Sequence, residues 1–152
     1  MGDTWIVDIT RYLLPGGILV GGPAGRIARY FNQGIRYVLL SALLELDAKP
    51  DLLKELFELY PDDGMADWLY GPALDAFRRE GDTAISRKLL SEAKKANPYV
   101  PAYLLGKKQL PKRLPDYVGL GDEREAVSCA AEYRKVWRRT SGALEWLERA
   151  GR

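Results

Sequence analysis

Apolar residues at helical spacing, interrupted by glycine and proline, dominate this 152-residue chain from residue 23 onward. In the first such run, successive apolar positions lie 4, 4, 3 and 4 residues apart, which places them on one face of a helix. Pro23 and Pro50 suit first helical turns, because the amide that proline lacks has no partner there. We therefore predict helices over about 23–47 and 50–59, with these residues facing inward: Ile27, Phe31, Ile35, Val38, Ala42, Leu52, Leu53, Leu56 and Leu59.

A third helix is predicted from about Met65 to Glu80, after a break at residues 60–64. Pro72 stands in its middle, where a proline removes a backbone hydrogen bond and clashes with the carbonyl four residues back. We expect either a kink at this point or a helix that begins near Gly71. The residues predicted to face inward are Leu69, Ala73, Ala76 and Phe77.

The next helix follows directly, because Gly81 permits a turn and Asp82 is predicted to cap the amides of the new helix. Its end is predicted at Asn97-Pro98, since the residue before a proline disfavours the helical conformation. The predicted apolar stripe consists of Ile85, Leu89, Ala93 and Ala96.

Three segments complete the chain. A short helix over about 101–107 leads into residues 109–116, whose spaced prolines predict an extended connector. Asp122, with Glu125 three residues later, has the spacing of a capping box and opens another helix. The last helix is predicted to begin at 141–143, and the inward residues of the two helices are Ala126, Ala130, Tyr133, Trp137, Leu144 and Leu147.

A Gly-Asp pair recurs at 81–82 and 121–122, an offset of 40 residues that is close to the period of helical-hairpin repeats. Counting from Asp82, Ala93 and Pro98 occupy the small-residue and proline positions of a tetratricopeptide repeat. Tyr133 and Arg138 occupy those positions in the second copy, which is therefore degenerate. The fold predicted is all-α, a tetratricopeptide-like array of about three helical hairpins with an irregular amino-terminal arm.

A series of short motifs runs in order along the chain: Asn-Pro-Tyr-Val-Pro-Ala-Tyr-Leu-Leu over 97–105, Leu110-Pro111, Gly121-Asp122, Glu125-Ala126, Trp137 and Gly142-Ala143-Leu144. In this series the chain resembles the carboxy-terminal part of the suppressor of tumorigenicity 7 protein family and related uncharacterised bacterial proteins, over roughly residues 47–147. The resemblance implies a tetratricopeptide-like helical fold and no established enzymatic chemistry. The hydrophobic membrane segments expected at the amino-terminal end of the eukaryotic members are missing here.

Residues 1–22 are predicted to form an arm and glycine-rich loop before a single helical-repeat domain over 23–152. Residues 4–12 mix β-branched and aromatic side chains and fit either a strand or an extended arm. Such an apolar segment needs a surface to cover, so it could pack across the array or pair with another copy in a homo-oligomer. Acidic Asp3 and Asp8 argue against an export signal, and no apolar run reaches the length that spans a membrane. We expect a cytoplasmic protein.

The residue inventory excludes several kinds of enzyme. Histidine is absent, which removes Ser-His-Asp triads and His-ligated metal sites, and one cysteine cannot form a disulfide or a zinc cage. Residues 21–25 lack the Lys-Ser/Thr pair that completes a phosphate-binding loop. Cys129 is predicted to be a buried, inert thiol. We therefore expect a noncatalytic protein with no cofactor and no metal.

Charge is distributed unevenly along the chain. Residues 1–82 carry eight basic and thirteen acidic side chains, a net −5, whereas residues 83–152 carry fifteen and eight, a net +7. Basic residues near the carboxy terminus could dock an acidic partner or follow a phosphate backbone. Most aromatic residues of this half should be core, but a few could line a groove as anchors. The predicted partner-binding residues are Tyr70, Tyr99, Tyr103, Lys107, Lys108, Lys112, Arg113, Arg134, Arg138 and Arg139.

Two functions fit these patterns. The first is a noncatalytic helical-repeat scaffold that binds a protein or peptide partner, self-association included. The alternative is a nucleic-acid-binding accessory protein that uses the carboxy-terminal basic face.

Overall fold

The computed structural model describes residues 35–46 and 50–150, and every regular element in these ranges is an α-helix. The predicted all-α class is therefore confirmed for this part of the chain. The arm over residues 1–22, the helix start at Pro23, and Ile27 and Phe31 lie outside the described residues. The chain divides into two compact units, Met1–Pro61 and Asp62–Arg152, and the predicted domain over 23–152 spans that division.

The first unit contains two described helices, α3 (Ile35–Glu45) and α4 (Pro50–Leu59), which contact each other. The predicted helix over 50–59 is confirmed. The inward face predicted for α3 is wrong at Val38, which is 57% exposed. Because α3 is apolar over most of its surface, several faces fit the helical spacing equally well and packing decides among them. The buried leucines of the unit are Leu39, Leu40, Leu43, Leu44, Leu53 and Leu56.

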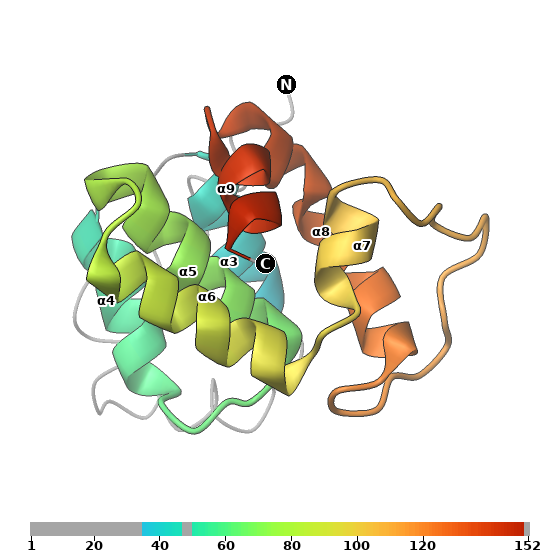
Figure 1. Cartoon of the computed structure of the whole chain (residues 1–152). Helices are drawn as coiled ribbons and strands as arrows, with labels where there is room; N and C mark the ends of the chain where they lie inside the picture. Colours follow the sequence, from blue (N-terminus) through green and yellow to red (C-terminus); the bar gives the residue numbers. More distant parts are fainter. Residues whose placement is uncertain (1–34, 47–49, 151–152) are drawn as a thin grey trace, which may run out of the picture. The chain divides into compact units, whose positions relative to one another are not determined.

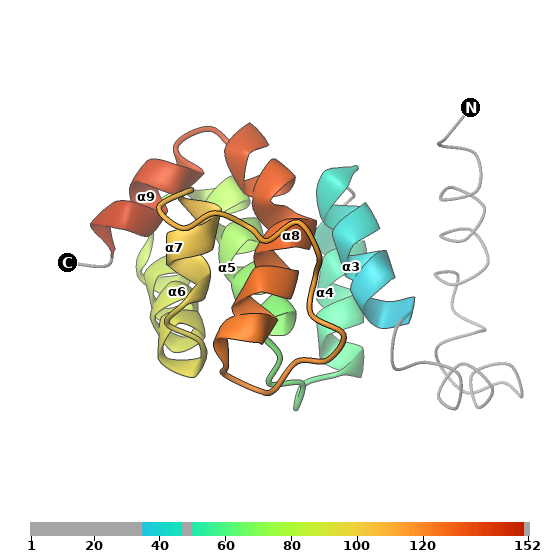
Figure 2. The same cartoon turned by 90° about the vertical axis from the view of Figure 1, so that its right-hand side faces the viewer.

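The second unit is built around α5 (Ala66–Glu80), which contacts α6 (Ala84–Ala96), α8 (Glu123–Arg139) and α9 (Ala143–Arg149). Figures 1 and 2 show α5 and α6 lying side by side as a helical hairpin. A five-residue helix, α7 (Val100–Leu104), packs against α8 and α9. The connector over residues 105–122 joins α7 to α8 without a helix of its own.

The turn between α5 and α6 differs in detail from the prediction. Thr83, not Asp82, is the N-cap of α6: its side chain accepts from the Ser86 amide, and Ser86 Oγ accepts from the Thr83 amide at 2.9 Å. Asp82 instead accepts hydrogen bonds from Arg87 Nε at 2.7 Å and from Trp146 Nε1 of α9 at 2.9 Å. The start of α6 moves by one residue as a result. The buried residues of α6 are Ser86, Leu90 and Ala93. The predicted stripe is confirmed at Ala93 and wrong at Ile85, which is 61% exposed, and at Ala96, which is also exposed, because packing against α5 selects a neighbouring face.

Pro72 lies inside α5, and the helix begins at Ala66 rather than near Gly71. The first turn is anchored from outside the helix, because the Ala66 amide donates to Glu125 Oε1 of α8 at 2.9 Å. Trp68 and Tyr70 of the same segment are buried. This packing offsets the hydrogen bond that Pro72 cannot make.

Aromatic side chains from three helices form the centre of the second unit. Phe77 of α5 stacks on Trp146 of α9, with ring centroids 4.4 Å apart and planes 18° from parallel. The ring of Trp146 is also stacked with that of Trp137 of α8, with ring centroids 6.3 Å apart. Trp137 contacts Tyr70 edge-on, with ring centroids 6.5 Å apart. The predicted burial of Trp137 and Leu147 is confirmed, whereas Trp146, not Leu144, is the large buried residue of α9.

A buried carboxyl group, that of Glu125, joins three segments of the chain on the other side of the unit. Glu125 is 2% exposed, and besides the Ala66 amide it accepts from the Gly121 amide at 2.8 Å and from Asn97 Nδ2 at 2.7 Å. Asp122 caps α8 as predicted, since its Oδ1 accepts from the Glu125 amide at 2.8 Å. The reciprocal half of the predicted capping box is wrong, because the Glu125 carboxyl group binds other amides.

The 40-residue offset does not relate two similar hairpins in the described chain. Gly81 ends α5 and leads into α6, whereas Gly121 lies at the end of the connector and precedes α8. Both glycines have a positive φ, 71° and 77°, a backbone region that favours glycine. The helices they precede have different partners: α6 pairs with α5, and α8 with the short α7. The all-α architecture is thus established, and the tetratricopeptide-like arrangement is not confirmed.

Replacing Glu125 by alanine should lower the free energy of unfolding by about 3 kcal/mol, because three buried donors from separate segments lose their acceptor. Urea denaturation measures this loss. Glu132→Ala, on an exposed position of the same helix, is the matched control and should change stability by less than about 0.5 kcal/mol. Equal effects of the two substitutions would contradict the central role of Glu125.

Candidate functional site

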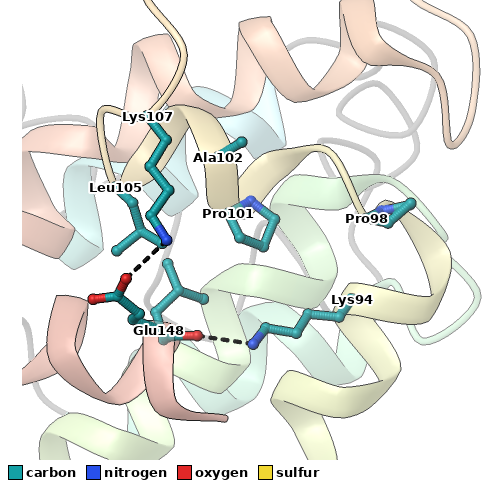
Figure 3. A pocket seen from close by; sticks show the side chains of 8 residues that line it. Lys94, Pro98, Pro101, Ala102, Leu105, Lys107 and Glu148 are labelled. Carbon is teal, nitrogen blue, oxygen red and sulfur yellow. Dashed lines mark hydrogen bonds and ion pairs between the residues drawn. The ribbon is translucent and has the colours of Figure 1, made fainter. Parts of the chain in front are cut away.

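The short helix α7 borders a pocket of about 350 Å³ that lies among the end of α6, α7 itself and α9 (Figure 3). Its walls are mostly apolar, and charged side chains stand at its edge. A volume of this size accommodates one bulky apolar side chain of a partner. The lining residues are Lys94, Pro98, Pro101, Ala102, Leu105, Lys107, Leu147 and Glu148.

Two lysines at this pocket also hold α9 in place. Lys94 Nζ donates to the carbonyl oxygen of Leu147 at 2.8 Å, and partial burial lowers the pKa of this lysine. Lys107 Nζ lies 2.8 Å from Glu148 Oε1 (Figure 3). The pocket edge therefore carries cationic groups whose positions are set by contacts within the second unit.

A cluster of aromatic and charged side chains lies on a different side of α7. Lys108 Nζ is 5.9 Å from the ring centroid of Tyr99 and 5.7 Å from that of Tyr103, within the range of cation–π attraction. Tyr103 donates to Glu123 Oε1 at 2.8 Å, and Lys108 lies 2.5 Å from the same oxygen. Hydrogen bonds from Lys108 and Tyr103 lower the pKa of Glu123. Tyr99 remains 43% exposed.

The turn after α7 explains how Lys108 reaches this cluster. Gly106 has a φ of 73°, and the Lys108 amide donates to the Ala102 carbonyl oxygen at 3.0 Å. A residue in this left-handed conformation ends a helix and reverses the chain. The predicted helix over 101–107 is accordingly shorter, ending at Leu104.

The connector places exposed apolar side chains next to the start of α8. Tyr117 is 70% exposed, and its ring centroid lies 4.5 Å from the guanidinium carbon of Arg124. Leu120 is 71% exposed and Leu114 is 50% exposed. Leu120 lies against Gly64, before α5. We call α7, its pocket and the residues Tyr99 and Lys108 the α7 surface.

The structure brings together only part of the predicted binding set. Tyr99, Tyr103, Lys107 and Lys108 belong to the α7 surface, although Tyr103 is only 7% exposed. Tyr70 is 1% exposed and donates its hydroxyl to the Asn97 carbonyl oxygen at 2.8 Å. The prediction of Tyr70 as a binding residue is therefore corrected, because this side chain belongs to the core.

The remaining predicted residues are basic and lie elsewhere on the second unit. Arg134 and Arg138 lie beside Gly106, Arg139 is exposed near the end of α8, and Lys112 and Arg113 are exposed on the connector. Arg113 pairs with Asp116 at 3.0 Å.

Sequence reasoning missed the apolar pocket walls. Pro98, Pro101 and Leu105 recur three and four residues apart, and this spacing was the available signal.

Cys129 is 2% exposed, as predicted, and burial raises the pKa of its thiol well above the usual range. The Cys129 side chain forms a hydrogen bond with Asp67, in the first turn of α5. Burial raises the pKa of Asp67 from 3.8 to about 6, and the charges of Glu125 and Glu132 add to this increase. A buried thiol with a raised pKa is a poor nucleophile.

No group of three or more acidic, cysteine or histidine side chains in the described part of the chain could hold a metal ion. No helix over residues 35–46 and 50–150 is long and apolar enough to cross a membrane.

Comparison of the chain with known proteins found no matching family model, no matching curated protein and no matching solved structure. The resemblance inferred from the motifs over residues 47–147 therefore stays a prediction.

Asp67 should make stability depend on pH. Its folded-state pKa is raised, so the folded protein holds this proton more tightly than the unfolded chain, and that stabilisation is lost as the pH rises from about 4 through about 6. Asp67→Asn should stabilise the protein above pH 6, by an amount on the order of 3 kcal/mol at most, and have little effect near pH 4. Urea denaturation across this range measures the difference.

Asp62→Asn, at an exposed position, is the control. Its effect on stability should not increase with pH in the way expected for Asp67→Asn. A constant effect of Asp67→Asn at all pH values would contradict the assignment.

Proposed function

We propose that this chain is a noncatalytic protein-interaction module whose α7 surface binds an amphipathic segment of a protein partner. The observation that carries the proposal is the apolar pocket beside α7, together with exposed Tyr99, the N-cap residue of the same short helix. Interfaces between proteins concentrate their binding energy where a bulky side chain enters such a pocket.

The exposed residues around α7 match the composition of binding surfaces. Tyrosine and arginine are enriched in interface centres, because each combines a large apolar contact area with a polar end. Tyr99, which is 43% exposed, provides such a group at the start of α7. Lys108 lies 5.9 Å from the centroid of this ring and restricts its motion, so binding would cost less side-chain entropy.

Charge indicates the kind of segment that would bind. Residues 83–152 carry a net +7, and the pocket edge carries two lysines, Lys94 and Lys107, against one carboxylate, Glu148, which pairs with Lys107. An acidic flank on the partner would be attracted to this half of the chain and would speed association. We therefore propose an apolar residue for the pocket, followed or preceded by acidic residues.

One observation favours the alternative of nucleic-acid binding. Three exposed basic residues form no ion pair in the described chain: Lys112, Arg138 and Arg139. Unpaired cations of this kind bind the phosphates of a nucleic-acid backbone. The aromatic residues near α7 could stack on unpaired bases. The experiment below separates the two functions.

Two substitutions test the α7 surface directly. Ala102→Phe should fill the pocket, and Tyr99→Ala should remove the exposed ring; each should reduce recovery of a co-purifying protein partner by about tenfold. Ala84→Phe, an exposed alanine at the start of α6, is the matched control for the first variant. The measurement is quantitative mass spectrometry of proteins that co-purify with the tagged chain, with and without nuclease.

The proposal requires a nuclease-resistant partner that the control retains and both α7 variants lose. Equal recovery by all variants would reject the α7 surface. Recovery that disappears after nuclease treatment would establish the nucleic-acid alternative instead.

A further inference from the structure

Arg134 and Arg138 lie one turn apart on α8, and their guanidinium groups converge beside Gly106. An atom at the Cβ position of residue 106 would lie 2.7 Å from Nη2 of Arg134 and 4.0 Å from Nη2 of Arg138. The first distance is too short for a real Cβ atom, so only glycine at this position leaves room for the Arg134 guanidinium group. Because residue 106 is a glycine with a φ of 73°, the Arg134 guanidinium group packs closely against this turn, with that of Arg138 next to it.

Neither arginine is neutralised by the part of the chain that the structure describes. Arg134 and Arg138 form no ion pair or hydrogen bond there, and Nε of Arg134 is buried without an acceptor. A buried donor without a partner is rare in folded proteins, because it has lost water and gained nothing in return.

The two lysines that follow Gly106 pair with acidic residues of α9 and α8. Glu148 pairs with Lys107 at 2.8 Å, and Glu123 pairs with Lys108 at 2.5 Å. The turn that brings Gly106 to the two arginines thus also directs its lysines to the local carboxylates. The two guanidinium groups remain as an uncompensated pair of positive charges.

We infer that Arg134 and Arg138 form a binding site for a phosphate dianion. Two guanidinium groups carry two positive charges, and a phosphate monoester or inorganic phosphate carries nearly two negative ones near neutral pH, whereas one carboxylate would leave a positive charge unpaired. Guanidinium groups also match the spacing of phosphate oxygens in paired hydrogen bonds. Free phosphate and a phosphorylated side chain of a partner share this chemistry.

This inference goes beyond the proposed function and does not need a protein partner. The site lies beside Gly106 and is made of α8 side chains, whereas the pocket and Tyr99 provide the proposed docking surface. Phosphate alone is therefore a sufficient probe, and its failure to bind would leave the protein-interaction proposal standing.

Titration with inorganic phosphate at constant ionic strength tests the site. The Nε–H signal of Arg134 in nitrogen-15 NMR spectra of the full chain should shift and saturate. The double variant Arg134→Gln/Arg138→Gln should weaken binding by about tenfold or more. The control Lys135→Gln/Arg139→Gln removes the same charge from exposed positions of the same helix and should weaken it by less than about twofold.

Two further arms complete the test. Arg138→Gln alone changes an exposed side chain, so it should stay folded and still weaken binding, which covers the case in which the double variant does not fold. O-phosphoserine in place of phosphate distinguishes the source: tighter binding of phosphoserine supports a phosphorylated partner, and tighter binding of phosphate supports the free ion.

Equal weakening by the double variant and its control would overturn the inference, because general attraction of charge would then explain binding. A shift that does not saturate would overturn it as well. Binding of an oligothymidine through these arginines, without a saturable response to phosphate, would assign them to a nucleic-acid backbone and reject the dianion site.

Discussion

The buried carboxyl group of Glu125 is the constraint on which the arrangement of the second unit depends. It accepts hydrogen bonds from the first amide of α5, from the turn before α8 and from Asn97 at the end of α6. A buried carboxyl group is stable only when donors surround it, so these three segments must meet at one place. This meeting holds the first turn of α5 in place, although Pro72 lies inside that helix. It also sets the position of α7, which follows Asn97 closely.

The aromatic stack and Asp82 secure the opposite side of the unit. Trp146 packs between Phe77 and Trp137 while its indole nitrogen donates to Asp82, so one side chain joins α9 to α5, to α8 and to the start of α6. Lys94 adds a contact with the α9 backbone. With α9 held in this way, the pocket beside α7 has walls on more than one side.

The α7 surface and the arginine pair both depend on the short turn over residues 105–108. The positive φ of Gly106 ends α7, directs Lys107 and Lys108 to carboxylates of α9 and α8, and leaves the guanidinium groups of Arg134 and Arg138 beside a residue without a side chain. This one turn therefore pairs its own two lysines, while Arg134 and Arg138 stay without an ion pair in the described chain. Net charge alone does not distinguish them.

Helical spacing, proline positions and the Asp122 cap are local properties, and from them the sequence by itself determined the helical class, most helix positions and the inward face of α8. Faces and roles that depend on distant partners could not be found in this way. Glu125 satisfies amides far along the chain, Asp82 bonds to Trp146, Tyr70 is covered by the core, and Val38 competes with neighbouring leucines for one buried face. Only the tertiary structure decided these, because burial and hydrogen-bond partners are set by segments that spacing along the chain does not relate.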